Sequence, residues 1–216
     1  MHKWERKYDG IIFDLDGVIC STDKYHYLAW REIADEEGIY FDKEINSRLR
    51  GVSRAESLEI ILENAKRIYT EQEKKFLMEK KNDIYKKYLE KMSESDLSDE
   101  VADTIQKLRR LGCKLAIGSS SKNAKLILGR LGLETFFDAI SDGTNIKHSK
   151  PDPEVFEKAA QFLKLKPESC LVVEDAKAGI KAAMSGGFSS AGFGEAVINS
   201  NATYHMEQFS DLLKFI

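Results

Sequence analysis

The sequence predicts an α/β fold, with a doubly wound parallel sheet as its core and a helical cap domain inserted after the first strand. Three observations lead to this prediction. Apolar runs such as Ile11–Phe13 and Cys170–Val173 are typical of buried strands in a parallel sheet. From residue 92 onward such runs alternate with helical segments, which indicates βαβ units. Residues 19–91, in contrast, show only helical periodicity.

The expected core domain consists of residues 1–18 and 92–216, and the expected cap domain of residues 19–91. The first cap helix carries apolar residues at three- and four-residue steps and should end at Gly38. A second helix is expected over 42–50. Ser53 with Glu56, and Thr70 with Glu73, form capping-box pairs that predict two more helix starts, the last helix running to about residue 92.

The core domain should alternate regularly between helices and strands, because turn and cap residues separate its apolar segments. The expected helices cover 99–111, 121–131, 153–163 and 176–184. The expected strands after the first cover 114–118, 137–140, 170–173 and 189–192. These strands would share one parallel sheet with right-handed crossovers.

The composition is that of an ordinary globular chain and excludes several classes of protein. The 216 residues include 33 Lys and Arg and 36 Asp and Glu, a net charge of −3, which argues against a nucleic-acid partner. No apolar run approaches the ~20 residues of a membrane span. The start of the chain has no apolar signal core and the 3 cysteines are sparse. We therefore expect a cytoplasmic monomer without membrane association.

Two acidic pairs follow apolar strands. Asp14 and Asp16 come after Ile11–Phe13, and Glu174 and Asp175 end or follow the run from Cys170. Carboxyl ends of parallel strands share one edge of the sheet, where open α/β folds bind ligands. Several carboxylates at one place require a cation, and hard oxygen ligands suit Mg²⁺. The alternative is that these aspartates only cap the helices that follow.

Two further polar loops should reach the same edge. Ser119, Ser120, Ser121, Lys122 and Asn123 lie between a strand and a helix, where hydroxyls and backbone N–H groups can bind an anion. An ordinary serine-rich helix cap is the alternative. Lys150, before Pro151, could neutralise a phosphate and the aspartates. A carboxylate nucleophile, a metal nest and an anion cradle together favour phosphoryl transfer.

Over nearly its whole length, the chain resembles the haloacid dehalogenase superfamily of phosphotransferases. The resemblance lies in four motifs that occur in this order, each after a strand: D-x-D-G, S/T before K-N, K-P and E-D. The resemblance implies a Rossmann-like, HAD-like core. The cap segments around His26, Gly51–Leu58 and Lys81–Asp83 are similar to those of the β-phosphoglucomutase family. This implies interconversion of β-glucose 1-phosphate and glucose 6-phosphate through β-glucose 1,6-bisphosphate.

The resemblance assigns roles to the core residues. Asp14 would be the nucleophile and Asp16 the general acid and base. Asp14, Asp16, Glu174 and Asp175 would bind Mg²⁺, with Asp16 using its backbone carbonyl. The transferring phosphoryl group would be held by Ser119, Ser120 and Lys150. The second phosphate would be held by Arg54 with Ser121, Lys122 and Asn123.

The resemblance also assigns roles in the cap. Thr22 and His26 would lie at the hinge and position Asp16, and the sugar pocket would be lined by Trp30, Gly51, Val52, Ser57 and Lys81. Ser21 and Ser120 depart from residues that occur in relatives without removing a catalytic group. A sugar-phosphate phosphatase is the competing function, because it would use the same core. A dehalogenase would not need the second acidic pair, and a binding module would leave the carboxylates idle.

Overall fold

The computed structural model describes residues 6–49, 52–194 and 200–216, which form two compact units. The core unit contains the described residues up to Ser21 and those from Ser93 onward, and the helical unit contains Thr22–Met92. That the helical unit serves as a cap domain remains a prediction.

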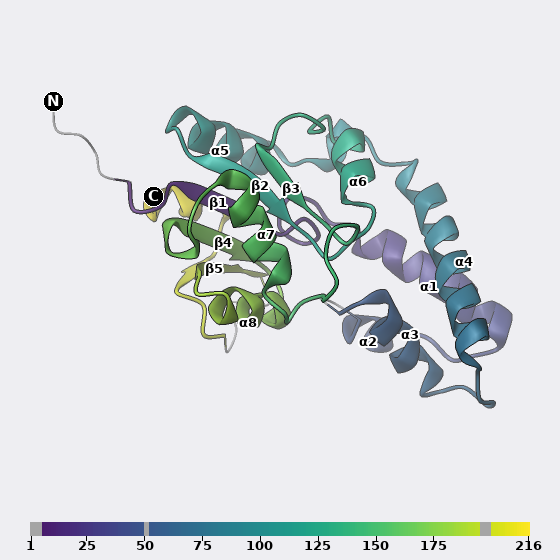
Figure 1. Ribbon diagram of the computed structural model, residues 1–216. Helices are drawn as coiled ribbons and strands as arrows, with labels where there is room; N and C mark the ends of the chain where they lie inside the picture. The colour runs from purple at the N-terminus through teal and green to yellow at the C-terminus, as the bar shows by residue number, and fades with distance from the viewer. Residues whose placement is uncertain (1–5, 50–51, 195–199) are drawn as a thin grey trace, which may run out of the picture. The chain divides into compact units, whose positions relative to one another are not determined.

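The core unit is built on a parallel sheet of six strands, which confirms the predicted fold class (Figure 1). The strand order is β3-β2-β1-β4-β5-β6. The strands are β1 (Gly10–Phe13), β2 (Lys114–Gly118), β3 (Ala139–Ser141), β4 (Cys170–Glu174), β5 (Ser189–Phe193) and β6 (Tyr204–Met206). Both β1 and β4 are fully buried, as their continuous apolar sequences require.

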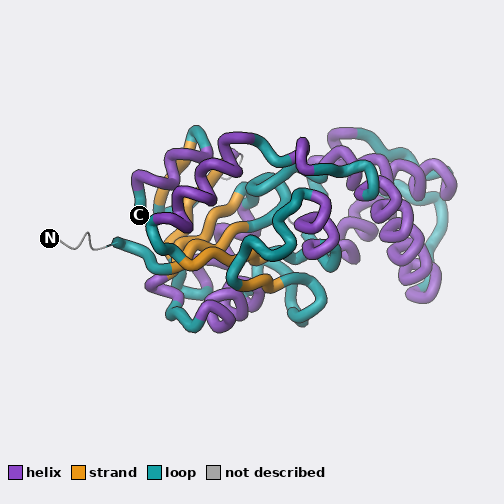
Figure 2. The backbone as a smooth tube through the Cα atoms, turned by 90° about the horizontal axis from the view of Figure 1, so that it is seen from above, coloured by secondary structure: helices purple, strands orange, loops and turns teal. Residues whose placement is uncertain are grey.

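Helices cover both faces of this sheet, as the view from above shows (Figure 2). They are α5 (Asp99–Arg110), α6 (Ala124–Arg130), α7 (Glu154–Leu163) and α8 (Lys177–Ser185), with short 3₁₀ helices η1 (Glu94–Asp96), η2 (Pro167–Ser169) and η4 (Phe209–Lys214). Ile12 and Val172 face a cluster that includes Phe156 of α7 and Ala183 of α8. Phe13 stacks on Phe209 of η4, so alternate strand residues fill two separate core layers.

Strand register brings four loops to one edge of the sheet. Phe13 pairs with Ile117 of β2 and with Val173 of β4, so the residues that follow these three lie in one row. The Asp14 N–H donates to Val173 O at 2.9 Å, and the Ser119 N–H donates to Ser141 O at 3.0 Å. The loops after β1, β2, β3 and β4 therefore start side by side.

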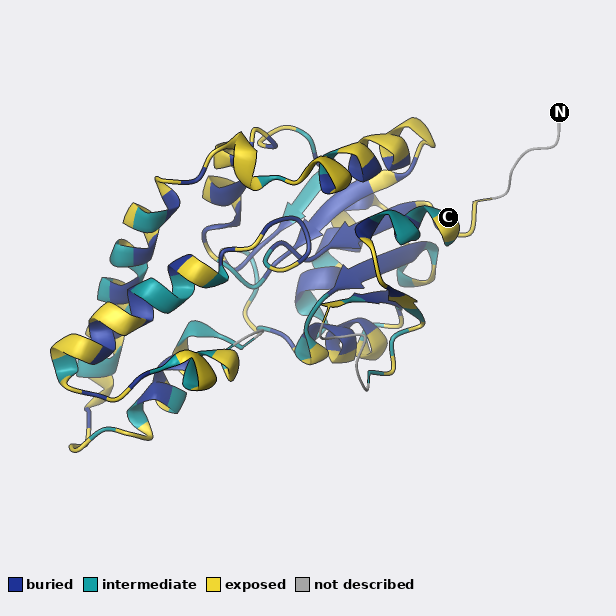
Figure 3. Cartoon of the chain, turned by 180° about the vertical axis from the view of Figure 1, so that it is seen from behind, coloured by how far each residue is buried: buried dark blue, intermediate teal, exposed yellow. Residues whose placement is uncertain are grey.

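The helical unit consists of α1 (Asp23–Glu37), α2 (Lys43–Ser47), α3 (Arg54–Leu62) and α4 (Glu71–Leu89). Both predicted capping boxes are present, at Ser53 with Glu56 and at Thr70 with Glu73. The α1 helix ends at Gly38, whose φ of 66° lies in the left-handed region. Figure 3 shows buried and exposed residues alternating along α4, as expected for a helix that covers a core.

The structure differs from the sequence-based prediction at several elements. The third strand is Ala139–Ser141 rather than 137–140, because Asp138 instead accepts from the Leu115 N–H. The helix expected from 121 begins at Ala124, because Ser119 and Ser121 hydroxyls accept the N–H groups of Ser121 and Asn123. The helix expected over 42–50 is only Lys43–Ser47, and β6 and η4 were not predicted. None of the helices in the described part of the chain has the length and hydropathy to span a membrane.

Candidate active site

A buried ion-pair cluster joins three loops at the carboxyl edge of the core sheet. The Lys150 ammonium contacts Oδ1 of Asp14 and lies 2.6 Å from Oε1 of Glu174. Exposure is only 4% for Lys150, 7% for Asp14 and 1% for Glu174. Asp14 follows β1 and Glu174 ends the neighbouring strand β4, so strand register alone makes them neighbours. The lysine that sequence analysis placed at this edge is the cation that joins them.

The protonation equilibria of these groups reflect crowding of like charges. Burial raises the pKa of Asp14, the Lys150 ammonium opposes this rise, and the carboxylates of Glu174, Asp175 and Asp16 add to it. Burial alone would lower the pKa of Lys150, but Asp14 and Glu174 raise it above its ordinary value. Burial and then Glu174 raise the pKa of Asp175 to about 7. The site therefore holds more negative charge than one lysine neutralises.

Two glycines make room for the second acidic pair. A Cβ at Gly17 would lie 2.0 Å from Oδ2 of Asp175, and Gly17 has a φ of 86°, which disfavours any side chain. A Cβ at Gly179, in the first turn of α8, would lie 1.8 Å from Oε1 of Glu174. The absence of side chains at Gly17 and Gly179 therefore leaves room for the carboxylates of Asp175 and Glu174.

The donor set fits Mg²⁺, because all of its side chains offer hard oxygen ligands and carry excess negative charge. The residues that would hold the ion are Asp14, Glu174 and Asp175, with the backbone carbonyl of Asp16. Within the described residues, no three His, Cys, Asp or Glu side chains are yet arranged as a closed metal cage. Lys150 bridges Asp14 and Glu174 in this arrangement.

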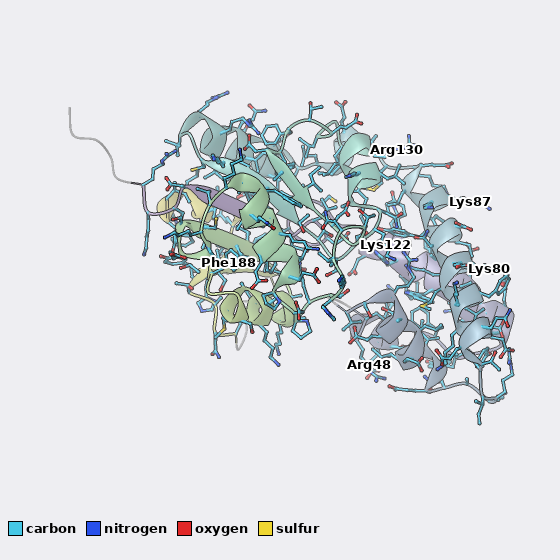
Figure 4. The ribbon with its side chains drawn as sticks, in the orientation of Figure 1. Arg48, Lys80, Lys87, Lys122, Arg130 and Phe188 are labelled. Carbon is cyan, nitrogen blue, oxygen red and sulfur yellow. The ribbon has the colours of Figure 1, made fainter. Side chains whose placement is uncertain are left out.

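The serine-rich loop and the Lys150 loop are joined to each other. The Lys150 N–H donates to Ser120 Oγ at 3.4 Å, and the Gly143 N–H donates to Ser121 O at 3.1 Å. Ser119 is 2% exposed and Asn123 7% exposed, whereas Lys122, labelled in Figure 4, is exposed. The predicted anion cradle thus has a buried base and one exposed cation.

Sequence analysis missed Asp142, which directly follows β3 at the same edge. Its side chain is 1% exposed, and Oδ1 accepts from the Thr144 N–H at 2.8 Å. Oδ2 is buried and has no hydrogen-bond partner among the described residues. Its position directly after a strand was the only available signal, because no acidic residue adjoins it as Asp175 adjoins Glu174.

In the helical unit, a buried lysine contacts a histidine. Lys81 is 2% exposed, and its ammonium lies 2.8 Å from Nδ1 of His26. Burial lowers the pKa of His26 strongly, and Lys81 and then Arg54 lower it further. The imidazole is therefore neutral, and because an ammonium can only donate, Nδ1 accepts and the proton is on Nε2.

Two aromatic rings also lie beside Lys81. Its ammonium lies 5.0 Å from the ring centroid of Trp30 and 4.6 Å from that of Tyr85, within cation–π range. The Tyr85 hydroxyl donates to Thr22 Oγ1 at 3.0 Å, so Thr22, which precedes α1, and His26 of α1 both contact α4. Trp30 is 2% exposed and belongs to the hydrophobic core of this unit.

The remaining predicted residues lie at the start of α3. Arg54 is the first residue of that helix and is half-buried, Ser57 is 4% exposed, and Val52 is half-buried. The guanidinium of Arg54 donates to Oδ1 of Asn82 at 2.7 Å. Gly51, predicted to line the sugar pocket, lies outside the described residues.

Comparison with known proteins supports an enzyme site. Residues 8–187 match the model of the haloacid dehalogenase-like hydrolase family. The chain is 42% identical to a β-phosphoglucomutase of Bacillus subtilis, over 94% of this chain and 90% of the relative. It is 30% identical to a phosphorylated carbohydrates phosphatase of Thermotoga maritima, over 83% and 82% of the two chains.

A solved structure agrees with the sequence comparison. The crystal structure of a β-phosphoglucomutase from Clostridium difficile superimposes with a TM-score of 0.88 at 37% identity, covering 95% of this chain and 93% of that one. The similarity spans both the core and the helical unit.

Proposed function

This chain belongs to the haloacid dehalogenase-like hydrolase family, and on that premise we propose that it is a β-phosphoglucomutase. It would interconvert β-glucose 1-phosphate and glucose 6-phosphate through an aspartyl-phosphate and β-glucose 1,6-bisphosphate. A family phosphatase that releases phosphate from small sugar phosphates is the second candidate, and the 30% identical Thermotoga maritima protein is the observation that favours it.

One observation carries the choice of mutase. The chain has two separate groups of cationic side chains: Lys150 with the serine loop in the core unit, and Arg54 with Lys81 in the helical unit. A phosphatase for monophosphates needs one phosphate subsite, whereas a mutase must accept a phosphate at either end of its intermediate. The relatives at 42% and 37% identity are both β-phosphoglucomutases.

The proposed cycle begins with phosphorylated Asp14. The free hydroxyl of the bound sugar phosphate attacks phosphorus, its O–P bond forms, and the O–P bond to Asp14 breaks. Asp16 accepts the hydroxyl proton. After the bisphosphate turns end for end, Asp14 attacks the other phosphorus, and Asp16 returns the proton to the leaving sugar oxygen.

The other residues of the core site position the reacting groups. Lys150 would donate to the oxygens of the transferring phosphoryl group from the place where it now bridges Asp14 and Glu174. Ser119 and Ser120 would donate from the buried side of the cradle. Bound Mg²⁺ would supply neutralisation of negative charge at the phosphoryl oxygens. Thr22 and His26 would orient Asp16, and exclusion of water by the helical unit would protect the aspartyl-phosphate.

The proposal is tested by a coupled assay on β-glucose 1-phosphate with Mg²⁺ and a trace of bisphosphate. We expect glucose 6-phosphate to form without equivalent release of inorganic phosphate, and chelation to stop turnover. Phosphate release that matches substrate consumption, with no need for bisphosphate, would assign the phosphatase function instead. We also propose that the enzyme is a cytoplasmic monomer, which gel filtration of the purified chain tests for the oligomeric state.

A further inference from the structure

Arg54 is held by an amide rather than by a carboxylate. Its Nη2 donates to Oδ1 of Asn82 at 2.7 Å, which joins the first turn of α3 to the middle of α4. Arg54 forms no salt bridge with any carboxylate of the described residues. A half-buried arginine is usually satisfied by Asp or Glu, since charged groups are rarely buried unless paired.

The surroundings of this guanidinium are electropositive. Burial lowers the pKa of Arg54, and the nearby Asp83 only partly opposes this effect. Arg54 and Lys81 both lower the pKa of His26, so the two cations act on the same imidazole. The helical unit therefore holds two positive charges close enough to act on one imidazole, and the hydrogen-bond acceptor of Arg54 is a neutral amide.

A neutral acceptor has a specific advantage at this place. The amide oxygen of Asn82 restricts the rotation of the guanidinium but does not neutralise it, so its remaining N–H groups keep their full attraction for an anion. A carboxylate of the same size would bind the planar fork strongly and compete with a phosphate for it. Asn and Asp differ here almost only in charge.

We propose that Asn82 is a positioning residue that orients Arg54 for the second phosphate of the substrate and, by being neutral, preserves its charge. This inference rests on the proposed function, because it takes Arg54 as a phosphate ligand. It assigns to Asn82 a role that depends on what the residue lacks, a negative charge, as well as on the hydrogen bond it forms.

The decisive variant is Asn82→Asp. If Asn82 only joins two helices, the new ion pair with Arg54 should be harmless or stabilising. If Asn82 preserves the charge of Arg54, KM for β-glucose 1-phosphate should rise about 10-fold to 100-fold, as for loss of a charge-assisted hydrogen bond. Asn82→Ala should raise KM less, because the charge remains although its orientation is lost.

Controls separate this effect from general changes in charge or folding. Gln72→Glu makes the same amide-to-acid change at an exposed position of α4, and KM should stay within about twofold of the wild type, since exposed charges are screened. Turnover of acetyl phosphate, which has no second phosphate, should be the same in Asn82→Asp and wild type. The thermal midpoint of Asn82→Asp should be equal to or above that of the wild type.

A double variant tests whether Asn82 acts through Arg54. Asn82→Asp should add little to the KM of Arg54→Ala, because the charge it compensates is already gone. The proposal is overturned if Arg54→Ala raises KM while Asn82→Asp does not, and the proposed function then stands. If Arg54→Ala itself leaves KM unchanged, the two-subsite basis of the proposed function fails instead. If Asn82→Asp does not fold, an unchanged KM in Asn82→Ala overturns the proposal.

Discussion

The two units of this chain bury lysines in opposite ways. Lys150 of the core unit bridges the carboxylates of Asp14 and Glu174. Lys81 of the helical unit instead contacts neutral His26 and the faces of Trp30 and Tyr85. The buried cation of the core unit is thus paired with two carboxylates, whereas these contacts of Lys81 are with a neutral imidazole and two aromatic rings.

Asp14→Asn should have the largest effect, because it removes the proposed nucleophile and leaves an oxygen that Lys150 can still bind. We expect mutase turnover to fall by at least about 10⁴-fold, as for other nucleophile replacements. The coupled assay measures turnover, and circular dichroism checks that the fold is retained. Substantial mutase activity in this variant would disprove the assignment of the nucleophile.

Lys150→Ala tests the core unit, where the buried lysine is paired with carboxylates. It leaves the buried carboxylates of Asp14 and Glu174 without their cation, which should cost about 3–5 kcal/mol of unfolding free energy. Turnover should fall about 10²-fold to 10³-fold, since a charge that stabilises the transition state is lost. Urea unfolding and the coupled assay measure the two effects. A variant as stable as wild type would show that this ion pair is not the main link between the loops.

Arg54→Ala tests the cationic residues of the helical unit, where the guanidinium of Arg54 donates to the neutral amide of Asn82. We expect KM for β-glucose 1-phosphate to rise about 10-fold to 100-fold, because one charge-assisted contact to the second phosphate is lost. Acetyl phosphate, with one phosphate, should be turned over at the wild-type rate. Equal losses on both substrates would count against separate phosphate subsites.

Lys81→Met should have the smallest effect. It should change the pH dependence of stability through the pKa of His26. Removal of the ammonium should raise the pKa of His26, although burial still keeps it below its ordinary value. A depressed pKa means that the unfolded chain binds the proton first, so stability should decrease as pH falls below about 6.5. Between pH 7.5 and 5.5, the unfolding free energy of the variant should decrease less than that of the wild type, and the two decreases should differ by about 1 kcal/mol or less. An identical pH dependence would mean that Lys81 does not act on His26.

The sheet edge could be predicted from the sequence because parallel strands bring their carboxyl ends together. Asp14 and Glu174 were assigned to one site from their positions at the ends of apolar runs, and strand register makes them neighbours. Lys150 was assigned to the same site because its loop reaches that edge, and its ammonium contacts both carboxylates. The helix starts at Ser53 and Thr70 were equally readable, since a capping box is a local signal.

Other features could not be read because they depend on contacts between distant segments. Strand β6 is three residues long and contains exposed His205, so neither its length nor its pattern marks a strand. Asn82 lies in the middle of a charged helix, where an amide gives no local signal. Its contact with Arg54 depends on the packing of α3 against α4.

Gly179 has a practical consequence for attempts to make this protein more heat-resistant. Replacing helix glycines by alanine is a common strategy that gains roughly 0.5–1 kcal/mol per position. In α6, Gly129 has open space where a methyl group would go, so the exchange should help there. In α8 the same exchange would push the methyl group into Glu174 and disturb the acidic pair it belongs to. An engineer guided by helix propensity alone would treat the two glycines alike and would damage the enzyme at the second.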